Sequence, residues 1–208
     1  MDSRSIVIPP CIEWGAASKT LPGETVCGDR HLVKLFPDGA LAAVIDGLGH
    51  GEDAAFAAET AVVVLEGSSL EPPDLLVKRC HEALMRTKGA VMSVASFHRS
   101  ENTLTWVGVG NVEGVVCRRN TGKAPARESL LMRGGVVGYQ LPTLRCSTLH
   151  LSEGDMLVFV TDGILSGFSE MLDAAEPPQR LADSILLRYW RRTDDALALV
   201  VRYLGGRP

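Results

Sequence analysis

Residues 42–51 have the sequence Ala42-Ala43-Val44-Ile45-Asp46-Gly47-Leu48-Gly49-His50-Gly51, in which an apolar run ends at an aspartate and three alternating glycines follow. The apolar run predicts a buried strand, and the Ala- and Val-rich segment after it predicts a helix. We therefore expect Asp46 to be held rigidly at the end of a sheet. The glycines let the backbone approach a ligand closely, and the carbonyl oxygen of Gly47 can itself bind a hard cation.

Three other aspartates lie in loops that adjoin predicted strands. Asp29 follows Cys27-Gly28, Asp162 follows the apolar run 156–161, and Asp194 precedes the apolar run 197–202. Carboxylates that converge from several strand ends repel one another unless a cation lies between them. Oxygen ligands select Mg²⁺ or Mn²⁺ over zinc. If the four loops meet, the sequence predicts a site for such ions.

Short strands and three helices are predicted around these loops. The expected strands are 12–17, 32–36, 41–45, 90–97, 104–109, 114–117, 130–132, 144–149, 156–161 and 197–202. Pro37-Asp38-Gly39 predicts a hairpin between the second and third strands, and the segment 90–117 has the pattern of an antiparallel meander. Helices are expected at 52–65, 74–88 and 179–189, and the polar segment 118–128 is expected to be a loop.

The order of these elements predicts the fold class. Strands come in hairpin series and helices in two clusters, which favours an α+β fold with helices packed over antiparallel sheets, not a doubly wound parallel sheet. The chain has 208 residues and 46% hydrophobic content, enough for one substantial core. Because no linker is long enough to divide it, one domain is expected over 1–208.

Composition excludes several classes of function. The net charge is -4 and no stretch collects Lys and Arg densely, so nucleic acid is not an expected partner. No apolar run approaches the roughly 20 residues that cross a bilayer and no signal peptide is evident, so we expect a cytoplasmic protein without membrane contact. The five cysteines contain no C-x-x-C pair, which argues against disulfides and structural zinc. A dinucleotide-binding fingerprint would need glycine where Glu52 stands.

The ordered motifs resemble those of the PPM family of metal-dependent protein phosphatases. They are Cys27-Gly28-Asp29, the turn 46–51, Leu151-Ser152-Glu153-Gly154-Asp155, Thr161-Asp162-Gly163 and Thr193-Asp194-Asp195. The resemblance spans almost the whole chain and is greatest to the bacterial SpoIIE/RsbU/RsbX branch, whose Gly-His/Asn turn is similar to Gly110-Asn111. Each motif is weak alone, but a chance match of all of them in the same order is improbable.

This resemblance implies a four-layer α-β-β-α sandwich with two antiparallel sheets and two divalent cations, Mn²⁺ or Mg²⁺. It implies that Asp46 bridges both metals, with the Gly47 carbonyl and Asp29 completing one site and Asp162 and Asp194 the other. Asp195 is not expected to be a ligand. The metal-activated water would attack phosphorus without a covalent phosphoenzyme, so Asp46 and Asp162 are the residues on which catalysis is expected to depend most.

The sequence departs from the family pattern at two positions. Eukaryotic-type members have a His directly after Asp-Gly, where this chain has Leu48, so the identity of a general acid stays open and His50 is one candidate. The branch commonly has Thr three residues after its first terminal Asp, where this chain has Leu197. These departures concern the tuning of the site more than the fold.

The resemblance implies a protein serine/threonine phosphatase of bacterial signalling. No sensor or membrane region is evident before the motifs, which favours the stand-alone members of the branch and phosphorylated stressosome STAS-domain proteins as substrates. Two alternatives stay open: a phosphatase of an anti-sigma-factor antagonist in another pathway, and a weakly active phosphoprotein-binding module with the same fold. The helices at 52–65 and 74–88 occupy the segments that form a regulatory switch in the branch.

Overall fold

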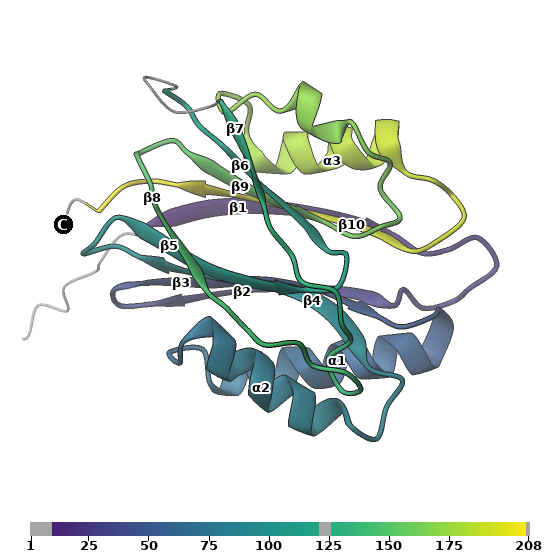
Figure 1. Ribbon diagram of the computed structural model, residues 1–208. Helices are drawn as coiled ribbons and strands as arrows, with labels where there is room; N and C mark the ends of the chain where they lie inside the picture. Colours follow the sequence, from purple (N-terminus) through teal and green to yellow (C-terminus); the bar gives the residue numbers. More distant parts are fainter. Residues whose placement is uncertain (1–9, 121–125, 207–208) are drawn as a thin grey trace, which may run out of the picture.

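Two five-stranded antiparallel sheets form the centre of the structure, a computed structural model that describes residues 10–120 and 126–206. One sheet has the order β1 (Ile12–Lys19), β10 (Ala196–Tyr203), β9 (Met156–Val160), β6 (Glu113–Cys117) and β7 (Arg127–Leu130). The other has the order β2 (Asp29–Phe36), β3 (Gly39–Gly47), β4 (Ala90–His98), β5 (Thr103–Val109) and β8 (Ser147–His150). The sheets stack face to face (Figure 1).

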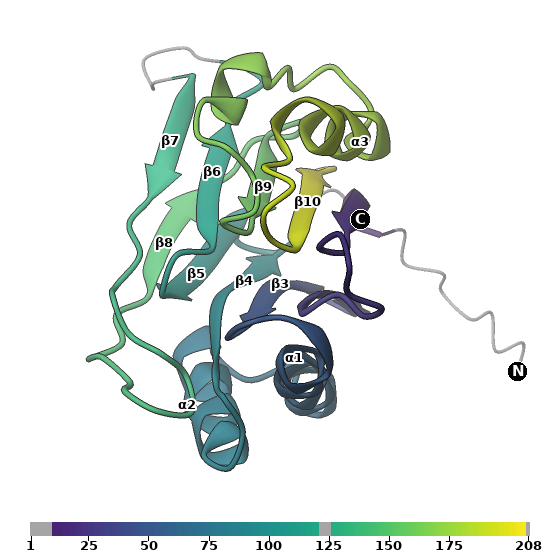
Figure 2. The ribbon, with the colours of Figure 1, turned by 90° about the vertical axis from the view of Figure 1, so that its right-hand side faces the viewer.

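Helices cover the two outer faces of this pair of sheets. Helices α1 (Gly51–Gly67) and α2 (Pro73–Leu84) lie over the sheet that contains β3, and α3 (Pro178–Tyr189) lies over the sheet that contains β10 (Figures 1 and 2). Apolar residues fill all three spaces between layers, with Trp106, Phe159 and Tyr203 between the sheets, Ile45, Leu65 and Leu84 under α1 and α2, and Val158, Phe168 and Ile185 under α3. The expected α-β-β-α sandwich is confirmed.

The hairpin expected around Pro37-Asp38-Gly39 is confirmed, because β2 and β3 pair along their whole length from Asp29↔Asp46 to Phe36↔Gly39. The predicted meander is correct only for its first pair, β4 and β5. The next strand, β6, pairs with β9 and β7 in the other sheet. Its alternate residues face two different cores, Val116 between the sheets and Val115 towards α3. Because both faces of β6 are buried, its sequence has no alternation of apolar and polar residues that would indicate which sheet it joins.

Several boundaries also differ from those predicted. The edge strand β7 lies partly inside the expected loop 118–128 and ends before the expected strand 130–132 does, and residues 121–125 of that loop lie outside the described residues. Strand β8 begins at Ser147 instead of 144, and α2 ends at Leu84 instead of reaching 88. A short 3₁₀-helix at Phe168–Met171 was not expected. Edge strands are polar on their exposed side, so their sequences resemble loops.

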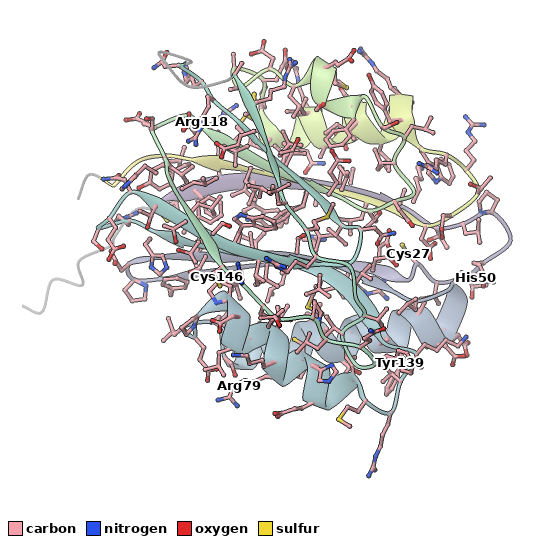
Figure 3. The ribbon with its side chains drawn as sticks, in the orientation of Figure 1. Cys27, His50, Arg79, Arg118, Tyr139 and Cys146 are labelled. Atoms are coloured by element: carbon pink, nitrogen blue, oxygen red, sulfur yellow. The ribbon has the colours of Figure 1, made fainter. Side chains whose placement is uncertain are left out.

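The strand ends that carry the predicted site lie at one end of the sandwich. Strand β3 ends there at Gly47 and α1 begins a few residues later, while Val160 at the end of β9 lies beside β10 near its first residues. His50 and Cys27 mark this end in Figure 3, and Figure 2 views the sandwich from it. Within the described residues no helix is long and apolar enough to span a membrane.

Candidate metal centre

Asp29 and Thr161 connect the two sheets at the base of the site. Asp29 is 4% exposed, and its carboxylate accepts a hydrogen bond of 2.8 Å from the Thr161 hydroxyl, which belongs to the loop after β9 in the other sheet. The same hydroxyl oxygen accepts a hydrogen bond of 2.9 Å from the amide of Leu197. Buried polar groups are normally hydrogen-bonded, and this pair satisfies both groups while joining the two sheets.

The aspartates of the site raise one another's pKa values. Burial raises the pKa of Asp46 to about 9, and the charges of Asp29, Asp162 and Asp194 add to the rise. Burial also raises the pKa of Asp29 to about 7, although the hydrogen bond from Thr161 opposes that rise. The pKa of Asp194 is raised as well, first by burial and then by neighbouring carboxylates that include Asp162. The four predicted aspartates therefore lie close enough to interact electrostatically.

A cavity of about 220 Å³ opens between the strand ends. Its walls include three of the predicted aspartates, Asp46, Asp162 and Asp194, together with Leu21, Leu48, Gly49, His50, Val91, Asn111 and Thr193. Asp29 is not on these walls; it lies beside Asp46 as its cross-strand partner and is buried. The structure thus brings the acidic side chains of both sheets together and places Asp29 behind the cavity surface.

Gly47 lies where β3 meets the start of α1. Its amide donates a hydrogen bond of 3.2 Å to the carbonyl oxygen of Gly28, next to Asp29. A Cβ atom at Gly47 would lie 2.0 Å from the backbone oxygen of Ala54 in α1, so only glycine fits. This close approach holds the backbone of Gly47 between two neighbouring segments, and Gly47, like Asp29, is not on the cavity walls.

The two consecutive aspartates before β10 have different surroundings. Asp195 is 3% exposed, and its two carboxylate oxygens accept hydrogen bonds of 2.7 Å from the amides of Leu21 and Gly28. Asp194 lines the cavity, and one of its carboxylate oxygens accepts the Asp195 amide at 2.9 Å. Asp195 is therefore engaged in holding the loop between β1 and β2, which agrees with the choice of Asp194 as the ligand. The structural role of Asp195 was not predicted.

Two further polar residues lie on the cavity wall. The Nδ2 atom of Asn111 donates a hydrogen bond of 2.8 Å to Oδ2 of Asp162. His50 precedes the first residue of α1, and its Nδ1 atom lies 2.6 Å from Oε1 of Glu24. In the sequence, Asn111 stands out only as part of the Gly110-Asn111 motif, which predicts no role for it at the site.

The donor set suits a hydrated hard cation. Among the residues that the structure describes, no three Asp, Glu, His or Cys side chains come close enough together to form a complete ligand group. Mg²⁺ keeps several waters and needs only one or two carboxylates, so carboxylates spaced around a cavity fit such an ion. All five cysteines are free and none lines the cavity, so the thiolate ligands typical of structural zinc sites do not occur there.

The fold is that of PPM-type phosphatases, and comparison with known proteins agrees. The family model described as "Stage II sporulation protein E (SpoIIE)" matches residues 37–204, so the chain belongs to the SpoIIE family. It is 23% identical over 176 residues to "Phosphoserine phosphatase RsbX" of Bacillus subtilis (strain 168), a match that covers 83% of this chain and 85% of RsbX. The expected enzyme class is thereby confirmed: the chain is a protein serine/threonine phosphatase.

Among the solved structures that share the fold are two that match over most of this chain. One, described as "The bacterial stressosome: a modular system that has been adapted to control secondary messenger signaling", is 30% identical with a TM-score of 0.83, covering 92% of this chain and 99% of that one. The other is RsbX in complex with magnesium, 21% identical with a TM-score of 0.82, covering 92% of this chain and 95% of that one. The likeness extends over nearly the whole length of all three chains.

Proposed function

We propose that this phosphatase is metal-dependent and hydrolyses phosphoserine and phosphothreonine on STAS-domain proteins of the bacterial stressosome. One observation carries the proposal: strand ends from both sheets bring Asp46, Asp162 and Asp194 to the walls of one cavity. The magnesium in the RsbX structure and the stressosome in the description of the other similar structure support it.

The residues that would hold two Mg²⁺ or Mn²⁺ ions are those around the cavity. Asp46 and the carbonyl of the next residue, Gly47, would begin one site, and Asp162 and Asp194 would complete the other, with Asp46 shared between them. Asp29 would contribute from behind Asp46, because its carboxylate is buried and hydrogen-bonded to Thr161. When bound, the ions would supply an activated water and offset the negative charge of the phosphoryl group.

The protein's own contribution is to bring these carboxylates together before the substrate arrives. The hydrogen bonds of Asp195 to Leu21 and Gly28 hold the loop that leads to Asp29, and the Thr161 hydroxyl holds Asp29 itself. Because the free carboxylates repel one another, the fold keeps them in place at a cost in stability that a bound cation would remove. The cavity thus stores electrostatic repulsion that favours cation binding.

The test is dephosphorylation of a phosphorylated STAS-domain protein by metal-depleted enzyme to which MnCl₂ or MgCl₂ is returned. Mass spectrometry measures the loss of phosphate. This loss should require the added metal and should be absent in the Asp46→Asn variant. Phosphate that survives long incubation with stoichiometric enzyme and either metal would refute the proposed substrate.

The same experiment separates the two alternatives. A phosphatase of an anti-sigma-factor antagonist would leave stressosome proteins phosphorylated but would hydrolyse a phosphorylated antagonist with the same metal requirement. A binding module would bind the phosphoprotein in a titration and release no phosphate from either substrate. The three carboxylates on the cavity wall favour turnover, because phosphate recognition alone has no use for a cluster of negative charge.

A further inference from the structure

Asn111 lies where the chain crosses from one sheet to the other, between β5 and β6. The backbone on both sides of it is fixed. Gly110 has a φ of 96°, its amide donates a hydrogen bond of 2.8 Å to the Arg133 carbonyl, and a Cβ atom there would lie 2.2 Å from Cγ1 of Val91. Val112 is fully buried, and its carbonyl accepts the Ser93 hydroxyl at 2.8 Å. The side chain of Asn111 is therefore presented from a well-defined backbone position.

The side chain of Asn111 makes a long-range contact. Its Nδ2 atom donates to Oδ2 of Asp162 at 2.8 Å, across 51 residues of sequence. An asparagine that serves only its own turn bonds to backbone one to three residues away. Here the amide instead reaches a carboxylate that lines the same cavity. This pattern points to a role at the site, not in the turn.

We infer that Asn111 is a positioning residue that holds the carboxylate of Asp162 in the orientation required for metal binding, an inference that rests on the proposed metal-dependent function. One carboxylate oxygen is held by the amide, and the other is left for a cation. Carboxylate ligands are commonly fixed in this way by outer hydrogen bonds, and loss of such a bond lowers metal affinity or activity about 10- to 100-fold.

The chemistry of the amide suits this task better than that of a charged donor. Lys or Arg at position 111 would hold Asp162 equally well but would place a positive charge beside the cation and oppose its binding. The amide is neutral, so it can orient Asp162 without neutralising it. A neutral imidazole can also donate one proton, so His is the replacement that should preserve the contact.

The test compares Asn111→Ala with Asn111→His at about pH 8, where the introduced imidazole is neutral. Calorimetric titration with MnCl₂ alone should show Mn²⁺ binding that is weaker by about tenfold or more for Asn111→Ala. For Asn111→His, the affinity should stay within about threefold of that of the parent protein. With p-nitrophenyl phosphate as the substrate, kcat of Asn111→Ala should fall while KM changes less than about twofold. Melting temperatures should be similar because Asn111 is exposed.

Asn120→Ala is the matched control. Asn120 is also exposed and follows β6 at its far end, where Cys117 pairs with Met156, so it lies away from the site. This variant should keep the parent values of affinity and kcat. If Asn111→Ala binds Mn²⁺ as tightly as the parent and keeps its kcat, the inference is wrong. If instead the parent protein neither binds Mn²⁺ nor hydrolyses the substrate, the proposed function itself fails, which is a separate outcome.

Discussion

Asp29 of β2 and Asp46 of β3 are direct cross-strand partners, and they are the last residues paired at the site end of the β2–β3 hairpin. Directly opposed residues of an antiparallel pair lie on the same face, so the two carboxyl groups are close and both partly withdrawn from solvent. This arrangement makes the metal-free site unfavourable when both groups are ionised. The first prediction follows from it.

Without metal, the protein should become less stable as pH rises from about 5 to about 9. The ordinary pKa of both groups is 3.8, and in the folded chain that of Asp29 is raised to about 7 and that of Asp46 to about 9. In this window the unfolded chain has released protons that the folded chain still holds, so the free energy of unfolding falls with pH. Thermal unfolding in EDTA measures this, and added MnCl₂ should stabilise the protein more at the higher pH. A metal-free melting temperature that rises across the window would contradict the prediction.

Asp46→Asn should abolish activity and stabilise the metal-free protein. The amide has nearly the same shape as the carboxyl group but does not titrate, so it removes the cost of keeping Asp46 protonated, beside Asp29, Asp162 and Asp194, at a pH far above its ordinary pKa. In EDTA at about pH 8 we expect a rise in melting temperature of about 2–4 °C, the shift that 1 kcal/mol produces in a chain of this size. Activity should fall at least about a hundredfold. Asp162→Asn should lose activity similarly.

Asp38→Asn is the control for both aspartate variants. Asp38 lies in the turn at the opposite end of the same hairpin, where its carboxylate accepts hydrogen bonds from the backbone amide and the hydroxyl of Ser100. The change should leave kcat and the Mn²⁺ requirement intact. Loss of activity in this variant would mean that the effect of Asp46→Asn does not arise at the cavity.

Substitution of the two consecutive aspartates before β10 should affect different properties, protein stability for Asp195 and Mn²⁺ binding for Asp194. Asp195→Ala leaves the amides of Leu21 and Gly28 without their acceptor, and we expect a loss of about 2 kcal/mol or more in the free energy of unfolding. Asp194→Asn should keep the stability of the metal-free protein but bind Mn²⁺ at least about tenfold more weakly. Denaturant unfolding and Mn²⁺ calorimetry on both variants make the comparison. If instead Asp195→Ala weakens Mn²⁺ binding and Asp194→Asn lowers the free energy of unfolding, the roles assigned to the two residues are wrong.

Helix α1 should influence the site through Arg30. The guanidinium of Arg30 donates to the carbonyls of Cys27 and Asp29 at 2.6 and 2.9 Å and pairs with Glu59 of α1 at 2.7 Å. Glu59→Gln removes the ion pair, so we expect a change in stability below about 1 kcal/mol but a higher Mn²⁺ concentration for half-maximal activity. Glu66→Gln is the control, because Glu66 lies near the C-terminal end of the same helix and pairs instead with Lys34 of β2. Equal effects of the two changes would argue against a specific connection.

Much of the fold could be predicted because its signals are local. The Pro37-Asp38-Gly39 turn and the apolar run that ends at Asp46 each indicate an element within a few residues. The assignment of β6 failed because it depends on distant pairing: Val115 lies opposite Val158, and nothing near Val115 in the sequence indicates that partner. The polar edge strand β7 has no local signal that separates it from a loop.

The site was predictable to the extent that its residues belong to ordered motifs. Asp46, Asp162 and Asp194 were predicted from such motifs, and the structure places all three on one cavity. The two hydrogen bonds that Asp195 accepts were not predictable, since the donors Leu21 and Gly28 are 174 and 167 residues away in the sequence. The contact of Asn111 with Asp162 was likewise not predictable, because it depends on where the chain passes from β5 in one sheet to β6 in the other, and not on either motif alone.

The order of the first sheet has a consequence for biosynthesis. β10, the last strand in sequence, lies between β1 and β9, and Asp194 immediately precedes it. While the ribosome is still making the preceding segments, β1 has no partner on this side and the residues after α3 are missing. A nascent chain that has not yet reached Asp194 therefore lacks one of the acidic residues of the cavity, and a truncated product that stops before Asp194 leaves β1 unpaired and the set of acidic groups incomplete.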